Sequence, residues 1–315
     1  MLTTKTAIEG FFQSIGVLFK RDVLLSTCCT WKIGGLADFL IEPASWKQVA
    51  LVLRYAGKND IPTVVIGQGS NLLFDDAGLQ GIVIKIGRRL SHINIVGTII
   101  HAESGISTPR LARAVSLAGL SGIEHIVGIP GTLGGLVFMN GGSLRKAIGD
   151  SITEVKTMDR QGNMRTFRRD ECGFAYRHSR FQNEGCVITG TVMELVPGRR
   201  DAILARMLQV LRERRKKFPL TLPNCGSVFK SNPRLYETSG SPGKIIETIG
   251  LKGTSVGGAI ISERHANFIV NKGAATAQDV LSLIARIRAR VIRETGFHLK
   301  CEVQFVESTG MIRSL

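Results

Sequence analysis

Apolar residues recur at helical spacing in the first part of the chain. Four of them follow Ser45, which together with Gln48 has the form of a capping box at a helix start. The four are Val49, Val52, Leu53 and Ala56. Short apolar runs at 63–66 and 81–86 then predict two buried strands. This region therefore alternates between helix and strand.

A second amphipathic helix is predicted from Thr108 to about Gly119. Pro109 suits its first turn, where the missing N–H group would have no partner in any case, and the glycine suits its end. The residues expected to face inward are Leu111, Val115 and Ala118.

Strand spacing dominates the middle of the chain. Residues 152–167 predict two strands joined by a turn at 159–162, and residues 185–196 predict another strand. A Pro-Gly break follows, and a helix is predicted across 197–220. We place a domain boundary near the start of that helix, because a chain of 315 residues suits two or three domains of ~100–200 residues each.

Basic residues outnumber acidic ones by 41 to 25, which gives a net charge of +16. One basic run is RERRKK at 212–217, and a second group lies on a helix whose start is marked by Thr276 and Asp279. The apolar face of that helix comprises Val280, Ile284, Ile287 and Val291. The arginines expected on its solvated outer face are Arg286, Arg288, Arg290 and Arg293.

This charge is compatible with two classes of partner, nucleic acid and small phosphate-bearing ligands. Aromatic residues make up only 6% of the chain and do not alternate with basic residues, as they do in proteins that stack on bases. The sequence therefore argues against nucleic acid as a partner and leaves the small anionic ligands.

The chain lacks the signals of a membrane-spanning or metal-binding protein. No run of about 18 apolar residues occurs, so no membrane span is expected. The N-terminal segment is weakly amphipathic and has no small-residue cleavage site of a signal peptide. The six cysteines form no C-x-x-C pair and no cluster with histidine, so no metal site is predicted. Free thiols in a reducing cytoplasm are expected.

Two glycine-rich segments follow apolar elements, GQGSNLLF at 67–74 and GIPGTLGGLVFMNGGS at 128–143. The first is not a dinucleotide-binding Rossmann turn, because the third glycine is missing and the following residues suit a strand. Small side chains let backbone amides approach a bound group, so the pair of segments favours a cradle for a diphosphate. A tight structural loop is the alternative for either segment alone.

The stretch NCGSVFK at 224–230 places Ser227 behind a glycine. It is not the nucleophile elbow G-x-S-x-G, because Phe229 stands where the second glycine is needed. From these residues alone, Ser227 is either a packed residue in a buried turn or a proton donor.

Several segments together resemble a known enzyme family. They are TCCTWKIGG (27–35), VVIGQGSNLLF (64–74), GIPGTLGGLVFMNGGS (128–143), YRHSRF (176–181), NCGSVFK (224–230), IIETIGLKGTSVGGAIISERHANFIVN (245–271) and CEVQF (301–305). In order and spacing, over about residues 20–306, the chain resembles the UDP-N-acetylenolpyruvoylglucosamine reductases of bacterial peptidoglycan synthesis.

The resemblance implies an α+β fold with a two-part FAD-binding region of the vanillyl-alcohol-oxidase-like type and an α/β substrate-binding domain. The implied order is a short N-terminal segment (1–20), the FAD-binding domain (21–197) and the substrate-binding domain (198–315). The FAD-binding domain would itself divide into subdomains at about 21–86 and 87–197.

The resemblance also implies a reaction and three catalytic residues. FAD would accept hydride from NADPH and pass it to the enolpyruvyl ether of a UDP-sugar, and Ser227 would protonate the neighbouring carbon. Arg177 and Glu302 would polarise the substrate carboxylate so that it takes an enolate-like form. Without the resemblance, Arg177 would be read as a surface residue and Glu302 as a carboxylate at a strand end.

Binding residues carry over from the same match. The residues implied for FAD are Gly67, Gly69, Ser70, Asn71, Gly131, Thr132, Gly134 and Gly135. For the UDP-sugar they are Asn232, Lys252 and Lys217. The residues implied for FAD belong to the same two glycine-rich segments whose composition favours a diphosphate cradle.

The chain departs from the family pattern in a few places. The segment after Phe229 is one residue longer, the loop at 233–243 is extended, and a valine-glutamine pair replaces the common valine-arginine after Glu302. No insertion follows Arg177, so the chain resembles the shorter subclass without a tyrosine capping loop. A flavin oxidase or dehydrogenase of the same fold, acting on another small substrate, is the alternative function.

Overall fold

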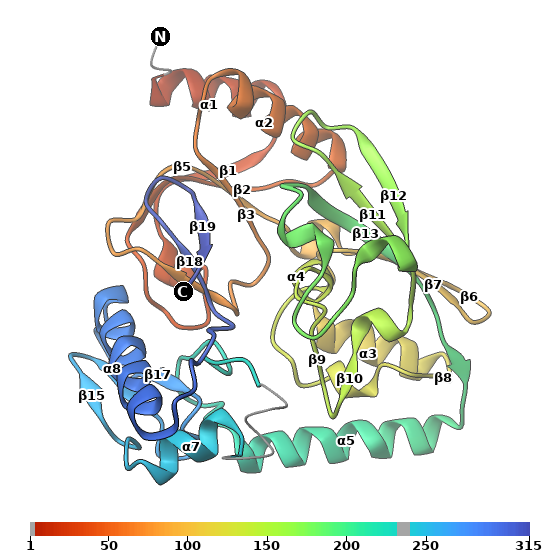
Figure 1. The fold of residues 1–315 in the computed structure, drawn as a ribbon. Coiled ribbons are helices and arrows are strands. Elements are labelled where there is room, and N and C mark those ends of the chain that lie inside the picture. The colour runs from red at the N-terminus through yellow and green to blue at the C-terminus, as the bar shows by residue number, and fades with distance from the viewer. Residues whose placement is uncertain (1–3, 232–239) are drawn as a thin grey trace. The chain divides into compact units, whose positions relative to one another are not determined.

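The computed structural model describes residues 4–231 and 240–315, and Figure 1 shows its ribbon. The described chain forms two compact units and passes between them several times. The first unit comprises residues 1–21, 39–68 and 81–214, and the second comprises residues 22–38, 69–80 and 215–315. The division into sequential domains with a boundary near residue 197 stays a prediction.

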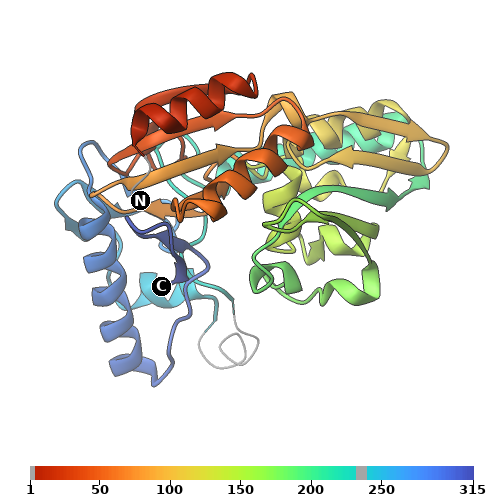
Figure 2. The ribbon, with the colours of Figure 1, turned by 90° about the horizontal axis from the view of Figure 1, so that it is seen from above.

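A four-stranded sheet in the order β1-β2-β5-β3 carries α1 and α2 on one face, seen from above in Figure 2. Phe11 of α1 stacks on Tyr55 of α2 with ring centroids 3.9 Å apart. The predicted apolar face of α2 is buried against this sheet, which confirms the helical spacing. The elements are α1 (Lys5–Ser14), β1 (Leu18–Leu24), β2 (Leu36–Glu42), α2 (Trp46–Lys58), β3 (Thr63–Ile66) and β5 (Leu79–Lys85).

The first unit also contains a five-stranded antiparallel sheet in the order β12-β11-β13-β7-β6. Its core is built from the apolar faces of these strands and of α3 and α4. The elements are β6 (Ile93–Val96), β7 (Ile99–Glu103), α3 (Thr108–Leu117), α4 (Leu133–Phe138), β11 (Ile152–Met158), β12 (Met164–Arg168) and β13 (Val187–Glu194). The predicted strands at 152–167 and 185–196 are thereby confirmed.

The remaining elements of this part of the chain are short strands, a long helix and 3₁₀ turns. The two-residue strands are β8 (Leu120–Ser121), which pairs with β14 (Val196–Pro197), and β9 (Gly142–Ser143), which pairs with β10 (Lys146–Ala147). Helix α5 (Arg200–Lys217) follows and buries Ile203, Met207 and Val210. Single 3₁₀ turns are η1 (Leu25–Thr27), η2 (Arg88–Leu90), η3 (Glu124–Ile126), η4 (Ile148–Asp150), η5 (Arg169–Cys172) and η6 (Arg180–Gln182).

The second unit joins two small sheets with α7 and α8. One sheet has the order β19-β18-β4, in which β18 runs parallel to β4, and the other has the order β15-β16-β17. Helix α8 lies against the β15-β16-β17 sheet (Figure 1). The elements are β4 (Leu72–Phe74), α7 (Pro242–Thr248), β15 (Ser255–Val256), β16 (Ala259–Ile261), β17 (Ile269–Asn271), α8 (Ala277–Thr295), β18 (Gln304–Val306) and β19 (Ile312–Ser314).

The start of α8 is fixed from two directions. Thr276 and Asp279 form the predicted capping box, and the predicted apolar face is buried. Asp76, from the segment between β4 and β5, also accepts hydrogen bonds from the backbone N–H groups of Ala277 and Gln278, at 2.8 and 3.2 Å. A carboxylate is favourable there because the first N–H groups of a helix lack partners within it.

Three local predictions are wrong. Ala118 is exposed at the end of α3 instead of facing inward, because the helix has already ended at Leu117. Gln48 Oε1 accepts from the backbone N–H of Ala44, one residue before the helix cap, so the capping box is incomplete. Arg288 is half-buried, and its guanidinium donates to the carbonyls of Leu299 and Leu315 at 3.0 and 2.8 Å, so it is not on a solvated face.

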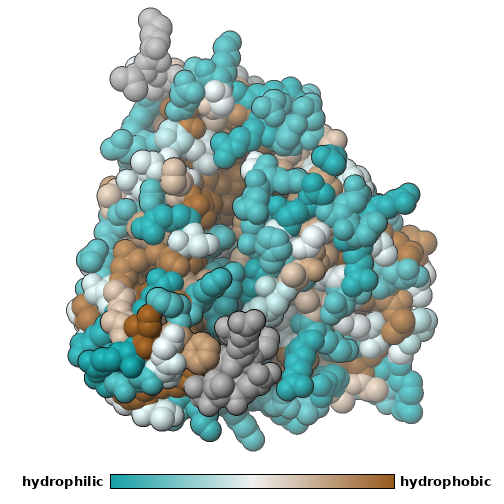
Figure 3. Space-filling view, viewed as in Figure 1, coloured by the Kyte–Doolittle hydropathy of each residue, from teal (hydrophilic) through white to brown (hydrophobic). Residues whose placement is uncertain are grey.

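The described residues include no helix that is long and apolar enough to cross a membrane. The face drawn in Figure 3 is mostly hydrophilic, with scattered apolar patches. All six cysteines are free thiols, and within the described ranges no three side chains of the metal-binding types form a group.

Candidate functional site

Ser227 lies in an extended segment of the second unit that pairs with the residues before β18. The N–H of Glu302 donates to the carbonyl of Val228 at 2.8 Å, and the N–H of Lys230 donates to the carbonyl of Lys300 at 2.9 Å. Phe229 and Cys301 form the antiparallel bridge between these two bonds. We call this pairing, residues 227–230 with 300–302, the Ser227 ladder. It brings Ser227 and Glu302 onto neighbouring segments of the chain although they are far apart in the sequence.

Val228 and Phe229 are buried, whereas Ser227 and Glu302 are half-buried. The ladder thus keeps its apolar residues inside and leaves both predicted catalytic side chains partly accessible. Burial raises the pKa of the neighbouring Cys225 thiol well above its usual value, and the negative charge of Glu302 raises it further. Cys225 therefore stays a neutral thiol beside these two residues.

Asn71, predicted to bind FAD, contacts the Ser227 ladder. Its Nδ2 donates to the carbonyl of Glu302 at 3.0 Å, and its own carbonyl accepts from the N–H of Gln304 at 3.1 Å. These bonds continue the parallel pairing of β4 with β18. Gly69, with a φ of +62°, belongs to the same loop and lies so close to the Cys28 carbonyl that a Cβ would collide with it. Glycine is required there on both counts.

In the first unit, Gly67 and Thr132 come from the two glycine-rich segments and lie in contact. A Cβ at Gly67 would collide with Thr132 Oγ1. Thr132 is the N-cap of α4, and its Oγ1 accepts from the N–H of Gly135 at 3.5 Å. The structure therefore places Gly67 next to the segment that contains Gly131, Gly134 and Gly135.

Ser104 lies against this glycine segment. Its carbonyl accepts from the N–H of Gly134 at 2.8 Å, and a Cβ at Gly134 would lie 2.9 Å from Ser104 Cβ. The hydroxyl of Ser104 is buried and has no hydrogen-bond partner among the described residues. Buried hydroxyls are rarely left this way, so its surroundings are incomplete without a further polar group.

Arg177 lies at a tight turn of the first unit in an unusual backbone conformation. Its φ is +52°, in the left-handed region that residues other than glycine seldom adopt. The turn is closed by reciprocal backbone bonds of 3.1 Å between Ala175 and His178. The guanidinium lies 5.3 Å from the centre of the Tyr176 ring, and its Nη2 donates to the carbonyl of Gly142 at 3.4 Å. Such strain persists only where the surroundings enforce it.

Side chains anchor this turn to the end of α4. Asn140 Nδ2 donates to the carbonyl of Ala175 at 2.9 Å, and Ser179 Oγ donates to the carbonyl of Phe138 at 2.7 Å. Gln182 Nε2 donates to the carbonyls of Phe138 and Arg177, at 2.9 and 3.3 Å. Arg177 is thus held beside the second glycine-rich segment.

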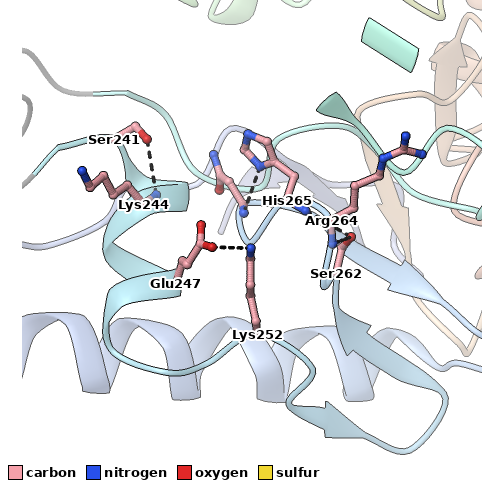
Figure 4. Close-up of polar contacts among 8 residues, drawn as sticks. Ser241, Lys244, Glu247, Lys252, Ser262, Arg264 and His265 are labelled. Carbon is pink, nitrogen blue, oxygen red and sulfur yellow. Dashed lines mark hydrogen bonds and ion pairs between the residues drawn. The ribbon is translucent and has the colours of Figure 1, made fainter. Parts of the chain in front are cut away.

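The lysines predicted to bind substrate lie near His265 in the second unit, and Figure 4 shows Lys252 and His265. The imidazole packs against Phe218 and Phe268, with ring centroids 5.3 and 5.1 Å away. Burial, together with the positive charges of Lys217 and Lys252, lowers the pKa of His265 to about 4. His265 is therefore neutral at physiological pH and adds no charge to this basic cluster.

The two lysines differ in their surroundings. Lys252 is half-buried and forms an ion pair with Glu247 of α7 at 2.5 Å between Nζ and Oε1. Lys217 is exposed, and its Nζ lies 5.6 Å from the centre of the Phe218 ring. Asn232, the third predicted substrate residue, lies outside the described residues.

Sequence reasoning missed Asn267, which is 5% exposed and contacts the Ser227 ladder. Its side chain bonds both backbone groups of Phe229, at 2.9 Å each. The only signal available was its place inside the segment ending HANFIVN, which does not reveal a partner so distant in the sequence.

Two family profiles match the chain. The one described as "UDP-N-acetylenolpyruvoylglucosamine reductase, C-terminal domain" matches residues 218–306, and "FAD binding domain" matches residues 37–168. Together they cover both glycine-rich segments and the Ser227 ladder.

Individual proteins match along most of the chain. UDP-N-acetylenolpyruvoylglucosamine reductase 1 of Corynebacterium glutamicum is 43% identical and covers 98% of this chain and 91% of that protein. UDP-N-acetylenolpyruvoylglucosamine reductase of Heliobacterium modesticaldum is 44% identical and covers 91% of this chain and 90% of that protein. The crystal structure of UDP-N-acetylenolpyruvylglucosamine reductase from Thermus caldophilus has a TM-score of 0.77 and 32% identity, covering 92% of this chain and 99% of that one.

Proposed function

The chain belongs to the UDP-N-acetylenolpyruvoylglucosamine reductase family, and we propose that it makes UDP-N-acetylmuramate with Ser227, Glu302 and Arg177 as its catalytic residues. The substrate is UDP-N-acetylglucosamine enolpyruvate, the cofactor is FAD and the reductant is NADPH. The alternative of a flavin oxidase acting on another small substrate is not favoured, because the match includes the family's own C-terminal domain.

The residues present fit a bound FAD. The hydroxyl of Ser104, beside Gly134, is buried without a hydrogen-bond partner among the described residues, and Gly67 closely approaches Thr132. Both observations support a polar ligand that lies against the backbone of the glycine-rich segments. FAD, when bound, supplies hydride transfer from NADPH to the enolpyruvyl carbon. The residues proposed to hold it are Gly67, Gly69, Ser70, Asn71, Gly131, Thr132, Gly134 and Gly135.

Ser227 Oγ is proposed to hold the proton that the substrate needs. Reduction of the enolpyruvyl double bond leaves negative charge on the carbon next to the one that receives hydride, and that carbon takes the Ser227 proton. A serine hydroxyl is a weak acid, so it can serve only where the surroundings stabilise the carbanion and the resulting alkoxide. Its half-buried position in a rigid ladder supports this role.

Glu302 and Arg177 are proposed to act on the substrate carboxylate. The adjacency of Glu302 and Ser227, fixed by the 2.8 Å bond from Glu302 N–H to the Val228 carbonyl, is the single observation that carries the proposal. It joins the predicted acid to a second predicted catalytic residue without any sequence proximity. For Arg177, the support is its strained conformation, since strain of this kind is concentrated at functional sites.

Lys217 and Lys252 are proposed to bind the diphosphate of the UDP-sugar. Both lie close enough to His265 to lower its pKa, which supports a local excess of positive charge. Glu247 already pairs with Lys252, so an incoming diphosphate would compete with that carboxylate. Asn232 remains a proposed contact to the sugar.

The activity belongs to peptidoglycan precursor synthesis. We propose that it takes place in the cytoplasm and that it supports cell shape and division through wall growth. The six free thiols support this location, because disulfides are rare in the reducing cytoplasm.

Stoichiometry tests the proposal directly. Purified holoenzyme should oxidise NADPH only when the enolpyruvyl sugar nucleotide is present, and mass spectrometry should show a product heavier by two hydrogens. Equal oxidation of NADPH with and without that substrate would overturn the proposal, because the electrons would then not pass to the enolpyruvyl group.

A further inference from the structure

Asn267 binds the backbone of the Ser227 ladder through both its side chain and its own backbone. Its Oδ1 accepts from the N–H of Phe229 and its Nδ2 donates to the Phe229 carbonyl, at 2.9 Å each. Its own carbonyl accepts from the N–H of Val228 at 2.8 Å, and its N–H donates to His265 Nδ1 at 3.3 Å. A single buried residue thus makes hydrogen bonds to this backbone of the kind that a neighbouring strand would make.

Only an amide can do this at position 267. A primary amide offers one acceptor and two donors in a plane, whereas an ionised carboxylate only accepts and an alkyl group does neither. Replacing the amide would leave a buried N–H or carbonyl of Phe229 without a partner. The residue is therefore matched to the backbone that it contacts.

We call the hydrogen bonds from Asn267 to Val228 and Phe229 the Asn267 clamp. The peptide groups on either side of Val228 link this clamp to both proposed catalytic residues. The Val228 N–H is held by Asn267, while its carbonyl is held by the N–H of Glu302. Ser227 directly precedes Val228, so any shift of this backbone moves the serine and loosens Glu302 together.

Asn224 fixes the other side of Ser227. Its Oδ1 accepts from the N–H of Gly226 at 2.9 Å, and its Nδ2 donates to the carbonyl of Leu222 at 2.7 Å. Gly226 itself has a φ of +84°. Ser227 is therefore bracketed by two side-chain amides, of which Asn267 is the more deeply buried.

We infer that Asn267 is a positioning residue that sets the place of Ser227 Oγ relative to the substrate carbon, an inference that rests on the proposed function. Proton transfer needs donor and acceptor within about 2.6–3.2 Å. A displacement of about 1 Å can cost ~100-fold in rate. Loss of the clamp should consequently slow protonation of the substrate without altering the chemistry of NADPH.

The test compares three variants of the holoenzyme, Asn267→Leu, Asn267→Asp and Asn271→Asp. Asn271 is a matched control, because it is also buried in the second unit but its side chain bonds the backbone of Trp31, Gly273 and Ala275. Stopped-flow absorbance would follow reduction by NADPH and reoxidation by the enolpyruvyl substrate separately.

We expect Asn267→Leu to slow reoxidation about 100-fold and to leave reduction by NADPH within about twofold of wild type. Asn267→Asp should recover as the pH falls within the range above the His265 pKa of about 4, because burial raises the pKa of the new carboxyl and its protonated form again donates to the Phe229 carbonyl. Asn271→Asp should show no such recovery. Hydrogen exchange should quicken at residues 224–231 in both Asn267 variants and not in the control.

Equal slowing of both half-reactions, or a rate ratio of Asn267→Asp to wild type that does not change with pH, would overturn the positioning role. Normal wild-type turnover with such a result would leave the proposed function intact. Absence of substrate-dependent turnover in wild type would instead overturn the proposed function and this inference with it.

Discussion

Ser227 and Arg177, two proposed catalytic residues, are held in place by different means. The Ser227 ladder is fixed by backbone bonds of 2.8–2.9 Å on both sides of Val228. The Arg177 turn depends on side chains, including Asn140 and Gln182, and on a strained backbone at Arg177 itself. The side chain of Ser227 can therefore change without disturbing the backbone around it, whereas changing Arg177 also changes the conformational energy of its turn.

Ser227→Ala should produce the largest effect. General acid catalysis contributes ~100–10,000-fold, so reoxidation by the substrate should fall by that factor while reduction by NADPH stays nearly unchanged. Thermal unfolding should be close to wild type, because the ladder bonds are made by the backbone. Stopped-flow kinetics and calorimetry would measure both.

Ser227→Cys is the matched variant. A thiol is a better acid than a hydroxyl, so part of the lost rate should return. If Ser227→Ala instead slowed both half-reactions equally, the residue would be structural and the contrast with Arg177 would disappear.

Substitutions of the Arg177 side chain should lower activity. Arg177→Lys and Arg177→Ala should both lose about 2–5 kcal/mol of transition-state stabilisation, ~30-fold to ~4,000-fold, because an ammonium cannot offer a planar pair of donors to a carboxylate. The substrate-dependent rate of each variant provides the measurement. A lysine variant with near wild-type activity would show that charge alone suffices.

Arg177→Gly tests the strained turn itself. Relief of left-handed strain, ~1–2 kcal/mol, is opposed by the greater freedom of glycine in the unfolded chain, ~0.5–1 kcal/mol. The free energy of unfolding in urea should therefore stay within about 1 kcal/mol of wild type although activity is lost. A marked drop in stability would mean that the arginine side chain, more than the turn residues around it, holds this region together.

His265 should give the smallest effect, as a dependence of stability on pH. Its folded pKa of about 4 lies below the usual 6.5, so the unfolded chain binds a proton that the folded chain excludes. Its contribution to the free energy of unfolding is complete above pH 6.5 and is lost as the pH falls toward 4. A tenfold change in proton affinity corresponds to about 1.4 kcal/mol, so this contribution amounts to a few kcal/mol at most. Partial exposure of the ring reduces it further.

His265→Phe keeps the packing against Phe218 and Phe268 and removes the titrating group. Urea unfolding between pH 4 and 6.5 should accordingly lose part of its pH dependence in this variant. Because protonation also removes the acceptor for the Asn267 N–H, acid should loosen the ladder in wild type. Identical pH dependence in the two proteins would show that His265 does not control it.

Elements defined by local signals could be predicted from the sequence. Helix α8 is indicated by Thr276, Asp279 and a buried stripe at helical spacing, all within one segment. The strands at 152–158 and 164–168 follow from alternation around a turn. In each case the residues that decide the structure are close together in the chain.

Features that depend on distant partners could not be predicted in this way. The carbonyl partners of Arg288 come from the chain after α8, so its helical position alone suggests a solvated face. The role proposed for Ser227 rests on the family resemblance, and the hydrogen bonds from Asn267 to Phe229 are seen only in the structure. The local sequence pattern does not predict the left-handed backbone conformation of Arg177, because residues other than glycine usually avoid that conformation.

The parallel pairing of β4 with β18 constrains the order in which the protein can be completed during synthesis. Residues 72–74 leave the ribosome long before their partners at 304–306, because residues 75–303 are synthesised in between. Asp76 likewise cannot accept its hydrogen bond from Ala277 until the start of α8 has been synthesised. Pairing across such separations is slow, and an unpaired strand edge is prone to aggregation in the interval. The second unit therefore cannot complete this sheet until residues 304–306 have been synthesised.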